Sequence, residues 1–338
     1  MSISLQSPSN IALVKYWGKK GRQEPQNASV SFTLSQSVTQ MELDFIPKEN
    51  NQKIELDFLF AGERKEKFAA KIERYLASVA NELPFLYDYK LFIRSQNSFP
   101  HSAGIASSAS SMSALACCLV EMAEEIGFED YPYTTQAQNC SYFARLASGS
   151  ACRSVYKGAA IWGKTAHWED SSNDYAVDFN AAMHSVFHTY CDTVLLLSAQ
   201  EKSVSSTAGH NLMENNPFAP ARYAQAEENM GLILSALKAG DVDKVGEIAE
   251  EEALTLHGLM MLSRPAFILL SPNSLKVIEL VKNWRKDTGL PLYFSIDAGP
   301  NIHLLYPHYI YNEVQNFIQT ELKNYCQNGQ FINDKVGG

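Results

Sequence analysis

The sequence predicts an α+β fold in two domains. The chain has 338 residues, 46% hydrophobic and 19% charged, which suits about two globular domains with substantial cores. Segments in which apolar and polar residues alternate, as in half-buried strands, occur in both halves of the chain. Longer segments with apolar residues at helical spacing lie between them, and the second half mixes helices with strands of antiparallel type.

In the first half, strands are expected where β-branched and aromatic residues gather. We expect a strand over 10–17, a hairpin from 29–34 and 38–45, and further strands over 53–60, 89–94 and 158–162. Apolar residues recur every three or four positions in three helical segments, over 63–80, from the small-residue stretch to about 126, and over 134–146. A domain boundary near His184 divides the chain into 1–184 and 185–338.

The second half is expected to open with a strongly apolar strand over 190–197. Helical periodicity then predicts helices over 219–239, 242–261, 273–288 and 309–325. Two further strands, over 290–296 and 302–306, flank a short turn-forming segment.

Charge and cysteine content narrow the class of protein. A net charge of −9 argues against a general nucleic-acid binder, although a few cations in one cleft could still hold an anionic substrate. The six cysteines form no C-x-x-C pair and indicate reduced thiols. No stretch reaches the roughly 18 apolar residues of a membrane span, and no signal-peptide pattern is evident. We therefore expect a cytoplasmic protein without a membrane partner.

The stretch from Asn97 to Ala116 consists largely of serine and alanine, and it runs into a predicted helix. The first turn of a helix leaves N–H groups unpaired, so small residues there let a phosphate approach the backbone. Serine hydroxyls add hydrogen-bond donors, or an oxygen ligand for magnesium. Such helix starts are also common without any ligand. The stretch fits neither the G-x-x-x-x-G-K-S/T pattern nor G-x-G-x-x-G.

Three further clusters allow a functional and a structural interpretation. The lysines at 15, 19 and 20 could bind an anion or form a solvated strand end. The segment 148–154 could be a second anion cradle, in which the planar fork of Arg153 faces a carboxylate, or a surface loop. Asp297 follows an apolar strand and precedes Gly299, which suits a general base but also an ordinary turn.

Four stretches together resemble the mevalonate diphosphate decarboxylases of the GHMP kinase superfamily. They are Ser7–Lys19, Pro100–Ala109, Ser148–Ser154 and Ile296–Asn301, and their order and spacing match over nearly the whole chain. The resemblance implies an N-terminal domain like domain 2 of ribosomal protein S5, a ferredoxin-like C-terminal domain and a cleft between them. It also implies ATP with Mg²⁺, mevalonate 5-diphosphate as the other substrate, and a homodimer.

The resemblance also implies roles for particular residues. The catalytic residues would be Asp297, which orients or deprotonates the substrate hydroxyl, Lys15 beside it, Arg153 on the substrate carboxylate, and Asn10, which positions that arginine. The diphosphate would contact Tyr16, Lys19, Ser148, Gly149, Ser150 and Ser206. The ATP phosphates would lie on Ser102, Ala103, Gly104, Ile105, Ala106, Ser107 and Ser108. Either Ser107 or Ser108 would reach the magnesium ion.

The implied reaction is ATP-dependent decarboxylation to isopentenyl diphosphate, without a redox or pyridoxal cofactor. The sequence departs from the family pattern at Thr207, where some relatives carry arginine, and at His101-Ser102, where Thr-Ala is common. Thr207 leaves a decarboxylase of mevalonate 5-phosphate open, whereas His101-Ser102 could alter the fit of the phosphate loop. A 3-kinase is a further alternative within the superfamily. A catalytically silent binding or regulatory protein of the same fold is an alternative of another class.

Overall fold

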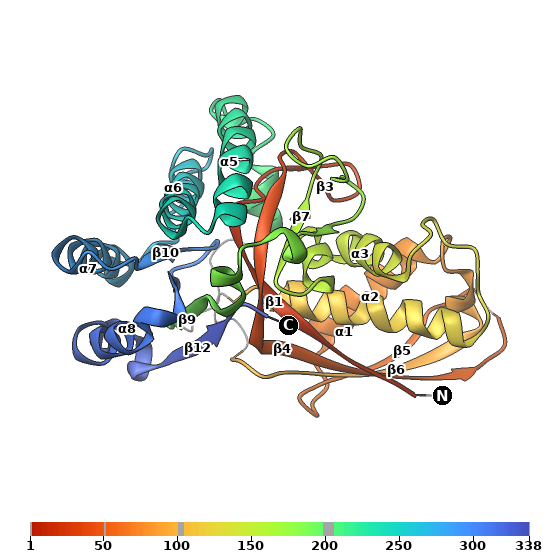
Figure 1. The fold of residues 1–338 in the computed structure, drawn as a ribbon. Coiled ribbons are helices and arrows are strands. Elements are labelled where there is room, and N and C mark those ends of the chain that lie inside the picture. Colours follow the sequence, from red (N-terminus) through yellow and green to blue (C-terminus); the bar gives the residue numbers. More distant parts are fainter. Residues whose placement is uncertain (1, 51, 101–104, 199–205, 338) are drawn as a thin grey trace.

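The structure is a computed structural model that describes residues 2–50, 52–100, 105–198 and 206–337. Figure 1 shows the N-terminal half at the right and the C-terminal half at the left, each with its own sheet. The N-terminal sheet has the strand order β5-β6-β4-β7-β8, and β1 pairs with β4 in addition. Its strands are β1 (Ser2–Val14), β4 (Ser29–Pro47), β5 (Glu55–Phe60), β6 (Tyr89–Asn97), β7 (Ala159–Trp162) and β8 (Val177–Asp178). Strands β2 (Lys19–Lys20) and β3 (Glu24–Pro25) form a separate short hairpin.

Three helices lie over one face of this sheet (Figure 1). They are α1 (Glu66–Val79), α2 (Ser107–Glu125) and α3 (Gln136–Ala147). Helix α1 is amphipathic and buries Ile72, Tyr75, Leu76 and Val79. Helix α2 packs between β1, β4 and α3, and its many alanines and serines permit this close approach. The small residues of the 97–116 stretch therefore serve packing along the helix as well as any site at its start.

The C-terminal half has a four-stranded antiparallel sheet in the order β10-β11-β9-β12. Its strands are β9 (Cys191–Leu195), β10 (Tyr293–Ser295), β11 (Ile302–Tyr306) and β12 (Phe331–Lys335). Its helices are α4 (Ser206–Asn211), α5 (Ala219–Ala239), α6 (Val242–Met261), α7 (Pro272–Thr288) and α8 (Tyr311–Phe317). Gly240 ends α5 in the left-handed region at φ +77°, and a capping box between Ser271 and Ser274 begins α7.

The two halves share a hydrophobic core. Phe32 of β4 belongs to the same buried cluster as Val194 of β9, Met230 of α5 and Ile248 of α6. The C-terminal strand also reaches the first sheet, where Leu34 forms an isolated β-bridge with Val336. Such a core fixes the position of one half relative to the other. The division of the chain at residue 184 stays a prediction.

The expected hairpin over 29–45 was wrong, because the segment is one continuous strand, β4. The N–H groups of Ser35, Gln36 and Ser37 lie where the turn was expected, and all three donate to the carboxylate of Asp334 at 2.7–3.0 Å. The segment 309–325 is helical as expected, but α8 continues after Phe317 as a π turn and a 3₁₀ turn. Strand β12, which was not expected, follows it.

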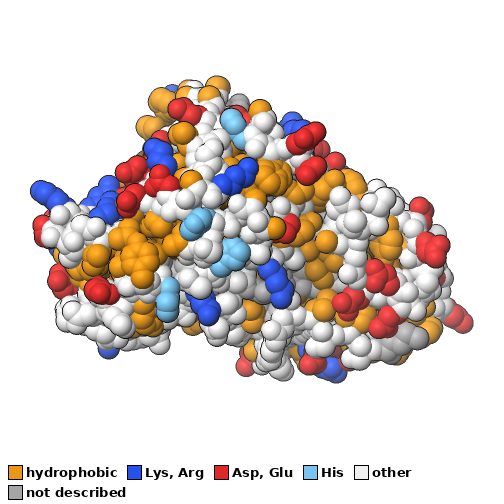
Figure 2. All heavy atoms as spheres, in the orientation of Figure 1, with side chains coloured by type: hydrophobic (Ala, Val, Ile, Leu, Met, Phe, Trp, Pro, Cys, Tyr) orange, Lys and Arg blue, Asp and Glu red, His pale blue; other side chains and the backbone are white. Residues whose placement is uncertain are grey.

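The surface agrees with the acidic composition. On the face seen in Figure 2, Asp and Glu side chains gather over the N-terminal half at the right, with fewer Lys and Arg side chains among them. No helix in the described part of the chain is long and apolar enough to cross a membrane. The six cysteines are free thiols.

Candidate active site

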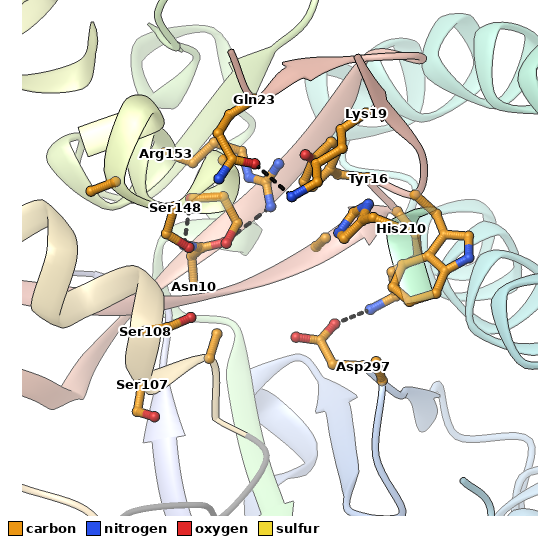
Figure 3. Close-up of a pocket in the computed structure, with 18 of the residues that line it drawn as sticks. Asn10, Tyr16, Lys19, Gln23, Ser107, Ser108, Ser148, Arg153, His210 and Asp297 are labelled. Atoms are coloured by element: carbon orange, nitrogen blue, oxygen red, sulfur yellow. Dashed lines mark hydrogen bonds and ion pairs between the residues drawn. The ribbon is translucent and has the colours of Figure 1, made fainter. Parts of the chain in front are cut away.

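A cavity of about 430 Å³ lies between the two halves. The N-terminal half contributes the end of β1, the start of α2 and the segment after α3, whereas the C-terminal half contributes His210, Leu256, Asp297 and Ala298 (Figure 3). Thirteen of the expected site residues line it. They are Asn10, Lys15, Tyr16, Lys19, Ile105, Ala106, Ser107, Ser108, Ser148, Gly149, Ser150, Arg153 and Asp297. The fold thus brings together four stretches that are far apart in the sequence.

An ion pair joins the two halves at this cavity. The Nζ atom of Lys15 lies 2.8 Å from Oδ1 of Asp297, and the two side chains are 2% and 29% exposed. Asp297 follows β10, and its backbone carbonyl lies 3.1 Å from Nε2 of the buried His257 on α6. His257 is a buried residue of α6, and its contact supports the backbone that carries Asp297.

The backbone of Lys15 is held from the C-terminal half. Its N–H donates to Oε2 of Glu252 at 2.8 Å, and its carbonyl accepts from NH2 of Arg222 at 3.0 Å. Arg222 and Glu252 form a bidentate pair, with side chains 1% and 0% exposed. Asn229 donates a further hydrogen bond to Oε1 of Glu252 at 2.8 Å. Each oxygen of the buried carboxylate therefore has partners, as a buried charge requires.

Arg153 is buried in a nest of polar side chains. Its Nε and NH1 atoms donate to the hydroxyls of Ser31 and Ser29 at 3.0 and 2.6 Å, and NH2 donates to Oδ1 of Asn10 at 3.3 Å. The amide nitrogen of Asn10 is tied in turn to Oγ of Ser154 at 2.7 Å. Burial lowers the pKa of the Arg153 guanidinium, while Cys152 and Asp297 act in the opposite direction. The result is a fixed guanidinium at the cavity wall, suited to a carboxylate.

The start of α2 opens onto the same cavity. Ala106 precedes the helix in the left-handed conformation at φ +37°, and none of the described side chains caps the first turn. The hydroxyl of Ser9 donates to the carbonyl of Ile105 at 2.6 Å and fixes the approach to the helix. Ser107 and Ser108 line the cavity there, beside N–H groups without helical partners. The expected contacts at Ser102, Ala103 and Gly104 lie outside the described residues.

A second group of donors lies at Tyr16, Lys19 and the segment 148–150. Gly149 is required there because an added Cβ would lie 2.9 Å from the rings of Tyr16 and Trp162. The Tyr16 hydroxyl has no hydrogen-bond partner among the described residues, and burial raises the pKa of this phenol. Burial also lowers the pKa of Lys19, whose Nζ donates to Gln23 at 3.0 Å. Ser206 is the first residue of α4, and its side chain lies outside the described set.

The charge of the cavity favours an anionic ligand. Among the residues that the structure describes, its lining carries four cations, Lys15, Lys19, Lys71 and Arg153, and one carboxylate, Asp297. This local excess contrasts with the net charge of −9 and would focus a positive potential. Within the described ranges, no three His, Cys, Asp or Glu side chains are grouped to hold a metal ion.

Sequence reasoning missed several residues of this site. Lys71 lies on the helix α1, where it looks like one of the helix's many exposed charges, and His210 follows a short segment without clear periodicity. Arg222 and Glu252 lie on α5 and α6 within amphipathic patterns. The sequence did offer a signal for Arg222 and Glu252, because each places a charge on the apolar side of its helix.

Comparisons with known proteins identify the family. Residues 7–173 match the model of the diphosphomevalonate decarboxylase-like N-terminal domain, and residues 193–336 match that of the mevalonate 5-diphosphate decarboxylase C-terminal domain. The diphosphomevalonate decarboxylase of Gibberella zeae is 30% identical over 322 residues, which are 90% of this chain and 80% of that protein.

Solved structures match over the full chain. Mevalonate diphosphate decarboxylase from Staphylococcus aureus is similar with a TM-score of 0.84 and 29% identity, over 99% of this chain and 96% of that one. A structure described as "MDDEF in complex with MVAPP, AMPPCP and Magnesium" also has a TM-score of 0.84 and 29% identity, over 100% and 97% of the two chains. The expected α+β fold with two GHMP-type domains is thereby confirmed. The chain belongs to the diphosphomevalonate decarboxylase family.

Proposed function

We propose that the protein catalyses the ATP-dependent decarboxylation of mevalonate 5-diphosphate. The products are isopentenyl diphosphate, ADP, phosphate and carbon dioxide. The observation that carries this proposal is the Lys15–Asp297 pair at 2.8 Å, which shares one cationic cavity with Arg153 and the uncapped start of α2. A carboxylate, a cation and an anion-binding helix start are the groups that phosphoryl transfer to a hydroxyl requires.

The substrate has an anionic group at each end, and the cavity offers a separate site for each. Its diphosphate lies on Tyr16, Lys19 and the segment 148–150, with Ser206 as a further contact. Its carboxylate faces Arg153, which Asn10 and two serines hold in place. The tertiary hydroxyl then lies between these ends, within reach of Asp297.

ATP enters from the side of α2. Its phosphates lie on the N–H groups at residues 102–108, with the hydroxyls of Ser107 and Ser108 as additional donors. An apolar pocket next to the same serines, lined by Phe58, Phe60, Phe68 and Ile72, suits the adenine ring. Magnesium arrives with the nucleotide and neutralises phosphate charge, and the oxygen of Ser107 or Ser108 is suitable as a protein ligand for it.

The steps follow from this placement. Asp297 orients the tertiary hydroxyl and accepts its proton as the oxygen attacks the γ-phosphorus of ATP, and ADP leaves. The bond between the tertiary carbon and the phosphorylated oxygen then breaks, inorganic phosphate leaves with the electron pair, and positive charge develops on the tertiary carbon. The electron pair of the bond to the carboxylate forms the carbon–carbon double bond, and carbon dioxide leaves. Lys15 offsets negative charge during phosphoryl transfer, and Arg153 holds the carboxylate until that bond breaks.

The test is a screen of the purified protein for carbon dioxide release with Mg²⁺-ATP and either mevalonate 5-diphosphate or mevalonate 5-phosphate. Release from the diphosphate, with one ADP for each carbon dioxide, supports the proposal. Faster release from the monophosphate would identify a decarboxylase of mevalonate 5-phosphate, the alternative that Thr207 leaves open. ADP without carbon dioxide would identify a 3-kinase, and absence of both would favour a silent relative.

We also propose that the enzyme works as a cytoplasmic homodimer. The six free cysteines, most of them buried, suit a reducing compartment. The dimer rests on the family resemblance, and a molar mass near 75 kDa by light scattering, twice the chain's 37.6 kDa, would support it.

A further inference from the structure

His210 of α4 lies in the wall of the cavity, although none of the expected roles involves it (Figure 3). The residue is 9% exposed. Its ring centroid lies 4.3 Å from that of Tyr16 and 4.6 Å from that of Trp17. Aromatic neighbours on two sides hold the imidazole in one orientation.

The contact between α4 and the segment after β1 depends on Gly209. A Cβ added at Gly209 would lie 2.5 Å from the ring of Trp17. Gly18, at φ +102°, makes room for α5 instead, because a Cβ there would lie 2.3 Å from the hydroxyl of Tyr223. The ring of Trp17 therefore packs directly against the backbone of α4, and this contact places His210 against the cavity.

The hydrogen bond of the ring defines its tautomer. The N–H of Gly18 donates to Nδ1 of His210 at 3.0 Å, so Nδ1 carries a lone pair. Burial lowers the pKa of His210 to about 3, and the charge of Lys19 acts in the same direction. The imidazole is neutral at physiological pH, and its proton resides on Nε2.

This Nε2–H is a donor at the wall of a cationic cavity. Within the described part of the chain, no acceptor lies within hydrogen-bonding distance of Nε2. The neighbours of the ring on the cavity side are Tyr16 and Lys19, the residues proposed to contact the diphosphate. A neutral donor there adds a hydrogen bond to an anion without placing a second positive charge beside Lys19.

We propose that the Nε2–H of His210 donates a hydrogen bond to a diphosphate oxygen of mevalonate 5-diphosphate. His210 is then a substrate-binding residue contributed by the C-terminal half of the chain, beside Tyr16 and Lys19 of the N-terminal half. This inference rests on the proposed function, because that function places a diphosphate at this end of the cavity.

Two substitutions separate the two nitrogens of the ring. The amide nitrogen of His210→Gln reaches the region of Nε2 and keeps the donor, but it removes the acceptor for the N–H of Gly18. The amide oxygen of His210→Asn lies near the position of Nδ1 and keeps that acceptor, but it removes the donor. The dissociation constant of mevalonate 5-diphosphate is measured by calorimetry without nucleotide for the wild type and both variants, with the melting temperature as a control for folding.

We expect His210→Asn to weaken binding about tenfold or more, since a hydrogen bond to a charged group is lost, and His210→Gln to stay within about threefold of the wild type. The KM for ATP should change little in both variants. Binding by His210→Asn at the wild-type level would overturn the proposal, because Nε2 would then make no contact. Weakened binding in His210→Gln alone would also overturn it, because the residue would then act only through Gly18. Failure of the proposed function looks different: the wild type would bind mevalonate 5-diphosphate and release no carbon dioxide.

Discussion

Two ion pairs of this protein lie near Lys15, and they differ in exposure. The side chains of Arg222 and Glu252 are 1% and 0% exposed, and both oxygens of Glu252 have hydrogen-bond donors within the protein. In the Lys15–Asp297 pair, the carboxylate is 29% exposed and lines the cavity. Groups of the protein satisfy the hydrogen bonds of the buried pair, and this pair positions the backbone of Lys15 directly after β1. The cavity pair can exchange a proton with a ligand. We therefore assign a structural role to Arg222–Glu252 and a chemical role to Lys15–Asp297.

The largest expected effect follows from breaking the buried pair. Glu252→Ala leaves the charge of Arg222 buried without a partner, and it also removes the acceptor for the N–H of Lys15. We expect the free energy of unfolding to fall by about 3–5 kcal/mol. Chemical denaturation measures this change, and Asp297→Ala is the matched control. If both substitutions cost the same, the distinction between a structural and a chemical pair is wrong.

A smaller effect is expected at Arg153, which is buried like Arg222 but faces the cavity. Arg153→Lys keeps the charge and loses the planar fork, so the KM for mevalonate 5-diphosphate should rise about tenfold. The KM for ATP should stay within about threefold, because the ATP phosphates lie at α2. Steady-state kinetics with each substrate varied in turn provide both values. A change in the KM for ATP alone would contradict the role given to Arg153.

The smallest effect concerns a third pair, Asp192 and His303, which are 1% and 2% exposed and lie 2.8 Å apart. Burial lowers the pKa of His303, but the charge of Asp192 and its hydrogen bond outweigh burial, so the pKa lies above the ordinary value. Asp297 acts in the same direction as Asp192, and Lys15 opposes it. A raised folded-state pKa stabilises the fold below about pH 6.5, and this contribution disappears as the pH rises through the folded-state value.

His303→Gln removes that pH dependence. We therefore expect the wild type to lose its stability advantage over this variant between pH 6 and the raised pKa of His303, as followed by urea denaturation at several pH values. A difference that stays constant or grows over this range would show that His303 is neutral in the folded protein.

The elements with strong periodicity could be predicted from the sequence. Helices α5 and α6 have the expected bounds, 219–239 and 242–261, and strand β11 has the expected bounds 302–306. Strand β4 could not be predicted, because its polar middle looks like a turn until Asp334, about 300 residues away in sequence, accepts its N–H groups. Local patterns carry no information about such a partner.

The candidate site shows the same limit. Residues in compact motifs, such as Ser107, Ser108 and Arg153, could be selected from the sequence, and the structure places them around one cavity. The contacts made by His210 and by the pair of Arg222 and Glu252 could not be predicted, because they join these residues to residues 15–18, directly after β1. A single histidine on a helix gives no signal, and the charges of Arg222 and Glu252 on the apolar sides of their helices do not show which residues they contact.

The central claim is that Asp297, supplied by the C-terminal half, acts on a hydroxyl that the N-terminal half holds. Asp297→Asn keeps the size of the side chain and removes the base, so the most direct measurement is its rate of carbon dioxide release at saturating ATP and mevalonate 5-diphosphate. We predict that turnover falls about 100-fold or more while the melting temperature and the substrate dissociation constant stay near the wild-type values. Turnover close to that of the wild type would contradict the account.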